Sequence, residues 1–80
     1  MRKNRWKMPR IMSLVRVSDE ANDAYVKHLN GPHPLQGLRL LFLGDIPNMP
    51  GHCVLLDHRT NKIHATWHTD SFVELTDEEL

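Results

Sequence analysis

Histidine and cysteine are the residue types in this chain whose side chains bind metals or serve as nucleophiles and general bases. The sequence contains six histidines and one cysteine among its 80 residues. His64 and His68 are four residues apart, the spacing of two metal ligands on one helical face. The surrounding residues favour a strand instead. Four strand residues span about 13 Å, a long separation for two ligands of one tetrahedral ion.

A metal site would therefore need a ligand from a neighbouring strand. If the predicted hairpin is symmetric, His52 and His64 become cross-strand neighbours, with Cys53 on the opposite face. The metal-binding alternative consists of His52, His64 and His68. We favour the interpretation that the histidines are solvated or locally hydrogen bonded, and we expect neither a metal nor a cofactor.

Catalytic chemistry has little support in the sequence. Cys53 stands beside His52, but it begins an apolar strand, where a lone cysteine is usually a small core residue. Asp45, Asp57 and Asp70 each follow a strand, and we expect them to be exposed turn-forming residues. We therefore predict that the protein is not an enzyme.

Positive and negative charges are separated along the chain. The ten bases balance the ten acids overall, but residues 1–10 hold five bases and no acid. Residues 11–80 therefore carry five bases against ten acids, a net charge of −5. We predict a flexible basic arm over residues 1–10 and an acidic tail over residues 76–80, with a fold-back of the arm onto the acidic body as an alternative. A nucleic-acid-binding arm would use Arg2, Lys3, Arg5, Trp6 and Lys7.

The apolar pattern predicts a single small domain over residues 11–75. Alternating side chains over 11–17 predict its first strand. Residues 18–30 form the predicted helix, because Ser18 suits the N-cap and Gly31 supplies a left-handed stop.

The second half of the chain has the pattern of a β-sheet. A nearly all-apolar strand over 38–43 is followed by a proline-bearing loop over 45–51. A hairpin then spans 53–67, and a short strand over 73–75 closes the sheet. Along the second hairpin strand we expect Ile63, Ala65 and Trp67 to face inward, and His64, Thr66 and His68 to face outward. The predicted core consists of Leu40, Phe42, Val54, Leu56, Ile63, Trp67 and Val73.

The predicted sheet ends with residues 68–75, HTDSFVEL, in which a His/Asp corner precedes a short apolar strand. This ending and the order of the strands resemble the small SH3-like barrels, in the broad sense that includes KOW and Tudor-type modules. The resemblance covers residues 11–17 and 38–75 and makes the helix over 18–30 an insertion. It implies a mainly β, SH3-like barrel with one inserted helix and a short C-terminal tail, a binding fold whose ligand stays open.

We expect a non-catalytic binding or accessory module that acts through protein–protein contacts. Rigid surface loops often carry binding residues, so the proline loop, the outward face of 63–68 and the helix form the predicted surface. The single cysteine suits a reducing compartment, and no apolar run approaches the roughly 20 residues of a membrane span, so we expect a cytoplasmic protein. The predicted partner-binding residues are Pro47, Asn48, Met49, Pro50, His64, Thr66 and His68.

Overall fold

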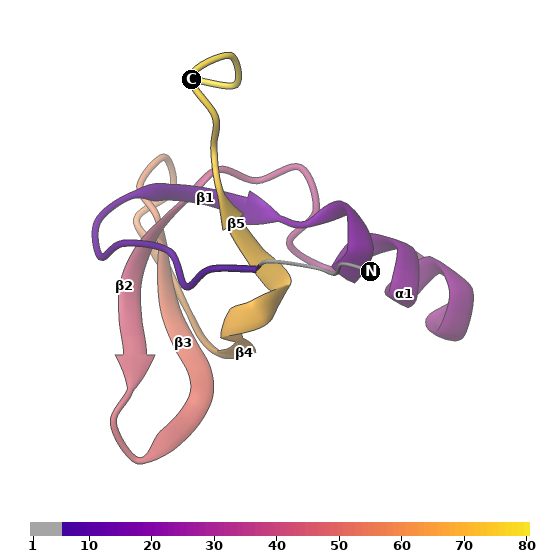
Figure 1. The fold of residues 1–80 in the computed structure, drawn as a ribbon, viewed down its shortest axis with the longest axis horizontal. Helices are drawn as coiled ribbons and strands as arrows, with labels where there is room; N and C mark the ends of the chain where they lie inside the picture. Colours follow the sequence, from indigo (N-terminus) through magenta and orange to yellow (C-terminus); the bar gives the residue numbers. More distant parts are fainter. Residues whose placement is uncertain (1–5) are drawn as a thin grey trace.

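The computed structural model describes residues 6–80, which form a sheet of five antiparallel strands with one α-helix. The strands follow the order β4-β3-β2-β1-β5 across the sheet. The prediction of a small, mainly β domain is confirmed. In chain order the elements are β1 (Leu14–Val17), α1 (Asp19–Leu29), β2 (Leu40–Ile46), β3 (Met49–Asp57), β4 (Lys62–His68), the 3₁₀ helix η1 (Thr69–Ser71) and β5 (Phe72–Glu74) (Figure 1).

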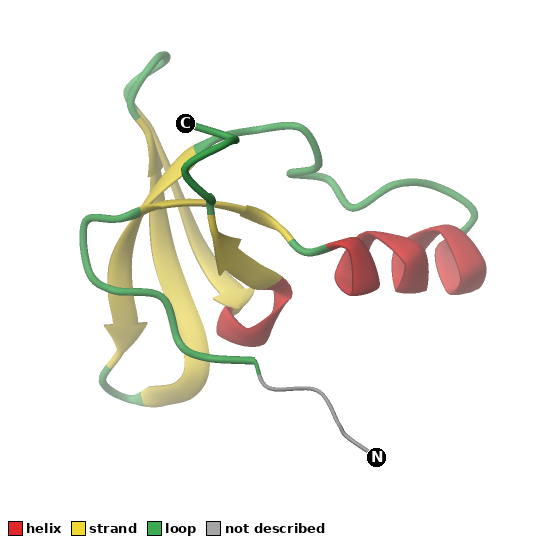
Figure 2. Cartoon of the chain, turned by 45° about the horizontal axis from the view of Figure 1, so that its top comes forward, coloured by secondary structure: helices red, strands yellow, loops and turns green. Residues whose placement is uncertain are grey.

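The sheet is curled because its two edges are joined by a very short connection. β1 pairs with β2 on one side and with β5 on the other, and β4 and β5 form the edges. Only the three residues of η1 separate these edge strands in the sequence. A 3₁₀ helix rises about 2 Å per residue, so the end of β4 and the start of β5 lie close together. Figures 1 and 2 show η1 at this junction.

Helix α1 is capped as the sequence predicts and projects from the sheet (Figure 2). The Ser18 hydroxyl accepts a hydrogen bond from the backbone N–H of Ala21 at 3.1 Å. The helix ends at Asn30, which adopts the left-handed conformation with φ 61°. Asn30 thus takes the role predicted for Gly31, because asparagine also tolerates this region. No residue of α1 is buried. Within the described part of the chain, no helix has the length and apolar character needed to cross a membrane.

The core lies on the inner, concave side of the curled sheet. The prediction is confirmed for Leu40 and Phe42, which are fully buried. It is wrong for Ile63, which is 54% exposed, and for three residues that are only half-buried, Val54, Leu56 and Val73. The buried apolar residues are Val15, Val17, Leu35, Leu40, Phe42, Cys53, Leu55 and Phe72.

Along β3, the prediction of which residues face the core is wrong by one position. Leu55 pairs with Phe42 and both are buried, whereas Leu56 pairs with Leu41 and with Ile63 on the outer face. Side chains alternate along a strand, so a shift by one residue exchanges the two faces. The outer face consequently carries an apolar row that runs across four strands, Leu14, Leu41, Leu56 and Ile63.

A β-bulge in β4 divides the predicted inward face, so that Trp67 faces the core whereas Ile63 and Ala65 do not. Cys53 pairs with Trp67 and Val54 pairs with Ala65, so Thr66 is the extra residue. Thr66 has φ 65°, in the left-handed region. The bulge turns Trp67 toward the core, where it is half-buried, and leaves Ala65 exposed on the outer face.

The first strand begins later than predicted. Residues 11 and 12 form a turn, and Met12 has φ 69°. The backbone N–H of Met12 donates to the Phe42 carbonyl at 2.6 Å, and the Phe42 N–H donates to the Ser13 carbonyl at 2.9 Å. The chain therefore changes direction before it enters β1 at Leu14.

His33 connects the helical insertion to the sheet. Its ring is 2% exposed and lies 4.5 Å from the Tyr25 ring, 4.9 Å from Trp67 and 5.9 Å from Phe72, measured between centroids. The Nδ1 atom accepts a hydrogen bond from the Leu35 N–H at 3.0 Å. Burial lowers the pKa of His33, because charge is disfavoured among these rings. The folded state therefore favours the neutral form of the His33 imidazole.

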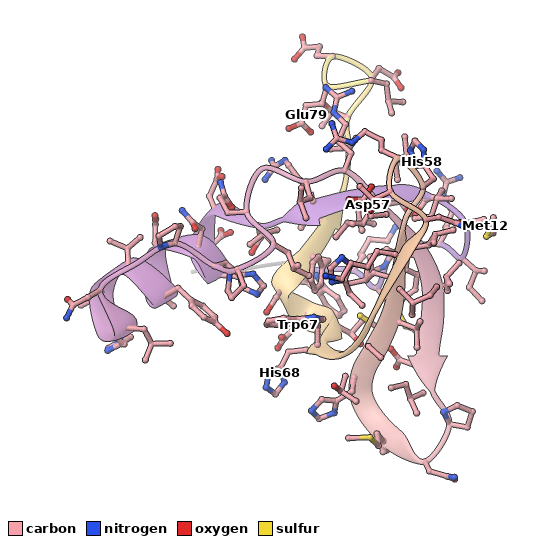
Figure 3. The ribbon with its side chains drawn as sticks, turned by 180° about the vertical axis from the view of Figure 1, so that it is seen from behind. Met12, Asp57, His58, Trp67, His68 and Glu79 are labelled. Carbon is pink, nitrogen blue, oxygen red and sulfur yellow. The ribbon has the colours of Figure 1, made fainter. Side chains whose placement is uncertain are left out.

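The C-terminal residues turn back onto β1. The Glu79 carboxylate accepts hydrogen bonds from the Thr76 N–H at 2.9 Å and from the Arg16 Nε at 2.7 Å. These two contacts, with the backbone contact the larger, lower the pKa of Glu79. The tail is acidic as predicted, and Glu79 attaches it to the sheet (Figure 3).

Core truncation tests the strand register. We expect Leu55→Ala to lower the free energy of unfolding by about 2–5 kcal/mol, because it leaves a cavity among fully buried side chains. Leu56→Ala, the matched control one residue along β3, should cost roughly 1 kcal/mol. Urea denaturation measures both values. A larger loss for Leu56→Ala than for Leu55→Ala would contradict the register.

The pH dependence of the free energy of unfolding tests whether His33 is buried in its neutral form. Because the pKa of His33 is lowered in the folded state, the unfolded chain binds more protons and stability rises with pH. The contribution of His33 should be fully present above about pH 6.5 and decrease as the pH falls below this value. Urea denaturation from neutral to mildly acidic pH should show this decrease, and His33→Phe should reduce it. His58→Ala, at an exposed turn, should leave it unchanged.

Candidate binding groove

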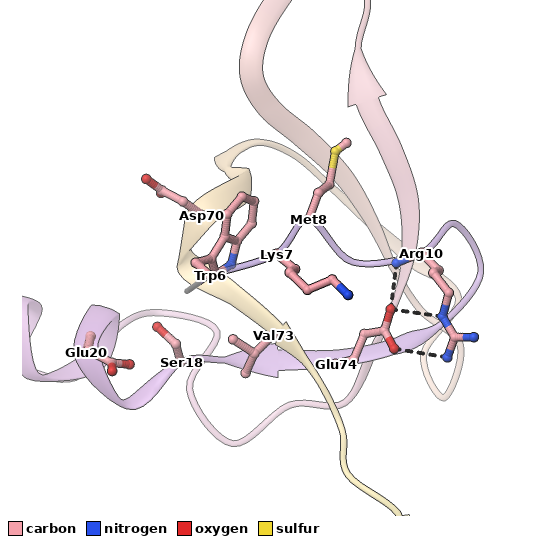
Figure 4. A pocket seen from close by; sticks show the side chains of 9 residues that line it. All are labelled: Trp6, Lys7, Met8, Arg10, Ser18, Glu20, Asp70, Val73 and Glu74. Atoms are coloured by element: carbon pink, nitrogen blue, oxygen red, sulfur yellow. Dashed lines mark hydrogen bonds and ion pairs between the residues drawn. The ribbon is translucent and has the colours of Figure 1, made fainter. Parts of the chain in front are cut away.

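A large open groove lies between the N-terminal segment, the start of α1 and the η1–β5 junction (Figure 4). Its volume is about 930 Å³. Trp6 and Met8 form an apolar wall, and Asp70 of η1 lies beside the indole. The lining residues are Trp6, Lys7, Met8, Arg10, Ser18, Glu20, Asp70, Val73 and Glu74.

The apolar wall exists because residues 6–10 lie against β5. The Trp6 Nε1–H donates a hydrogen bond to the Phe72 carbonyl at 2.9 Å, and Pro9 is buried. Trp6 is still 37% exposed and Met8 50% exposed. Residues 6–10 are therefore not a freely extended arm. They fold back onto the sheet, as the alternative prediction for the arm states. Arg2, Lys3 and Arg5 of the predicted arm lie outside the described residues.

Arg10 anchors the same segment to Glu74. The guanidinium donates from Nη2 to Oε1 at 3.1 Å and from Nε to Oε2 at 3.2 Å, and the Arg10 backbone N–H donates to Oε2 at 2.7 Å. This pairing raises the pKa of Arg10 and lowers the pKa of Glu74, in both cases chiefly through the side-chain hydrogen bonds. Much of the positive charge of Arg10 is therefore balanced within the protein.

The charge in the groove does not favour a phosphate backbone. Glu20, Asp70 and Glu74 contribute three carboxylates to the lining, against the two cations of Lys7 and Arg10. The Arg10–Glu74 pair is internally balanced. The remaining acidic side chains would repel phosphates and would favour a neutral or cationic ligand.

A second hollow of about 350 Å³ adjoins the first and shares Trp6, Met8 and Asp70 with it. We call the two hollows together the Trp6 groove. The second hollow also reaches the end of β4 and the start of β3. Its other lining residues are Asp45, Pro50, Gly51, His52, His68 and Thr69.

The predicted partner-binding residues are only partly brought together. Pro50 and His68 line the second hollow. His64 is half-buried opposite Leu55 on the inner face, so its predicted outward orientation is wrong, and Thr66 is the bulge residue. Pro47, Asn48 and Met49 are exposed in and beside the β2–β3 turn, outside the groove.

The histidines form a different pair from the predicted one. His52 lies opposite His68, with ring centroids 4.7 Å apart and an interplanar angle of 40°. The expected His52–His64 contact is wrong, because the hairpin register pairs His64 with Leu55, and the bulge then brings His68 opposite His52. Among residues 6–80 no group of three or more His, Cys, Asp and Glu side chains is arranged to hold a metal ion.

Three other potentially reactive side chains, those of Cys53, Asp45 and Asp57, are buried or form hydrogen bonds within the fold. Cys53 is fully buried, and this burial raises the pKa of its thiol, the opposite of what a thiolate nucleophile requires. Asp45 accepts a hydrogen bond from the Thr69 hydroxyl at 2.6 Å. Asp57 accepts from the Arg59 backbone N–H at 3.1 Å, as a turn former does, although it is buried and was expected to be exposed.

Met8, Glu20 and Asp70 were not predicted as site residues. Met8 lies within the run of bases, where charge dominates the sequence pattern, and Glu20 and Asp70 suit a helix start and a turn. Their proximity depends on the fold-back of residues 6–10, which no local sequence pattern signals. The chain matches no protein-family model, no curated protein and no solved structure.

The bulge beside the second hollow gives a test of local strain. An L-residue in the left-handed conformation costs about 1–2 kcal/mol, and a β-branched side chain makes this worse. Asparagine tolerates the conformation, so Thr66→Asn should raise the free energy of unfolding by about 1 kcal/mol. Thr66→Val keeps the branch and should give no gain. Equal stability of the two variants in thermal denaturation would contradict the bulge geometry.

Proposed function

We propose that this protein is a non-catalytic binding module that holds a segment of a partner protein in the Trp6 groove. The observation that carries the proposal is the larger hollow of this groove, which is open, has a volume of about 930 Å³ and exposes Trp6 and Met8 along its apolar wall. Exposed aromatic and methionine side chains in a hollow are typical of interaction sites. The surrounding carboxylates favour a neutral or cationic segment over a nucleic acid.

The proposed module is an SH3-like barrel with a helical insertion. Two features support this assignment, namely the strand order β4-β3-β2-β1-β5 and the single 3₁₀ turn between β4 and β5. Helix α1 lies between β1 and β2, where the insertion is expected. The proposal includes a cytoplasmic location, supported by the one free, buried cysteine.

Selection of peptides from a displayed random library on the full-length chain tests the groove. We expect binders, and we expect Trp6→Ala to weaken a selected peptide by about 30-fold, the effect of losing a 2 kcal/mol hot spot. Trp6→Phe keeps an apolar ring and should lose less. Met12→Ala is the matched control, because Met12 is 58% exposed but lies away from the groove (Figure 3). Affinities that Trp6→Ala leaves unchanged would contradict the proposal.

Salt dependence separates the protein-binding proposal from the nucleic-acid alternative. Three to five phosphate contacts on duplex DNA would give a log–log slope of about −3 to −4.5. We expect weak duplex and single-strand binding at physiological salt. Submicromolar binding that falls with this slope, and that disappears when Arg2, Lys3 and Arg5 are replaced by Gln, would support the nucleic-acid alternative instead. These substitutions leave the groove residues unchanged.

A further inference from the structure

His52 and His68 form a cross-strand pair whose imidazole rings lie close together. Their ring centroids are 4.7 Å apart. Two nitrogen atoms bound to one zinc ion, each at about 2.0–2.1 Å, lie at most about 4.2 Å from one another. Two rings at this separation are therefore close enough for one nitrogen of each to bind a common ion.

A backbone carbonyl orients one of the two rings. The Nδ1 of His52 lies 3.2 Å from the carbonyl oxygen of Pro50. Because a carbonyl only accepts hydrogen bonds, this contact assigns the proton of the neutral ring to Nδ1 and leaves the Nε2 lone pair for a ligand. A second hydrogen bond of this kind is the usual support of a metal-binding histidine.

The bulge at Thr66 places the second ring. With Thr66 as the extra residue, Trp67 opposes Cys53 and His68 opposes His52. A regular strand would put these side chains on the other faces. Left-handed backbone at a β-branched residue is uncommon, and such strain is frequently found at binding sites.

We propose that His52 and His68 bind one late first-row divalent cation, such as Zn²⁺, Ni²⁺ or Cu²⁺, with the remaining coordination positions left to water or to donors from a bound partner. Imidazole prefers these metals, whereas Mg²⁺ and Ca²⁺ prefer oxygen ligands. Asp45 and Asp70 line the same hollow and add negative charge near the ion. The proposed metal site lies within the Trp6 groove, but metal binding by the free chain does not require that a peptide binds there.

Calorimetric titration of the tag-free, full-length chain with Zn²⁺, Ni²⁺ and Cu²⁺ tests the proposal. We expect one ion per chain and no comparable binding of Mg²⁺. His52→Ala and His68→Ala should each weaken metal binding by at least about tenfold. Even the loss of a residue that only hydrogen bonds to a metal ligand lowers metal affinity by about 10–100-fold. His58→Ala and His64→Ala are matched controls and should retain the affinity.

Proton NMR of the histidine rings identifies the ligands directly. Zn²⁺ should shift the imidazole signals assigned to His52 and His68 and leave those of His33 and His58 in place. Circular dichroism of the metal-free variants shows whether each one is folded, and both replaced side chains lie partly exposed at the end of the sheet. Stoichiometric binding that persists in the double variant His52→Ala/His68→Ala, or no stoichiometric binding by the unmodified chain, would overturn the proposal.

Discussion

The β-bulge at Thr66 determines how the second half of β4 meets the rest of the protein. Its extra residue turns Trp67 toward Cys53 and the core, and places His68 beside His52 on the outer face. The left-handed backbone of Thr66 costs about 1–2 kcal/mol, which the packing of the indole against His33 offsets. The core contact of Trp67 and the histidine pair therefore depend on the same local distortion.

The helical insertion is held by polar and aromatic contacts more than by its own burial. No residue of α1 is buried, yet the Asn22 side chain accepts a hydrogen bond from the His33 N–H at 2.9 Å, and Tyr25 packs on the His33 ring. Protonation of the ring would place a charge among three aromatic side chains and remove the acceptor for the Leu35 N–H. The position of the insertion is thereby linked to the neutral state of one histidine.

The fold-back of residues 6–10 changes the chemistry expected of the basic arm. Arg10 is bound by Glu74, and Trp6 is hydrogen bonded to β5, so these residues become one wall of a groove that also contains Glu20 and Asp70. Trp6 and Lys7, two of the five residues that suggested phosphate binding in the sequence, thus lie among carboxylates in the structure. This arrangement supports the proposal that the ligand is a protein segment with exposed apolar groups.

The local elements could be predicted from the sequence alone. Ser18 as N-cap, the strand alternation and the turn residues predicted α1, the β content and the hairpin over 53–67, because each depends on neighbours along the chain. The strand register could not be predicted in this way. Val54 and Leu56 are as apolar as Cys53 and Leu55, and it is pairing with β2 that selects which of them face the core. The groove likewise depends on Trp6 meeting Phe72, 66 residues away. Contacts over such separations arise from packing and hydrogen bonding of the whole fold, which no local pattern contains.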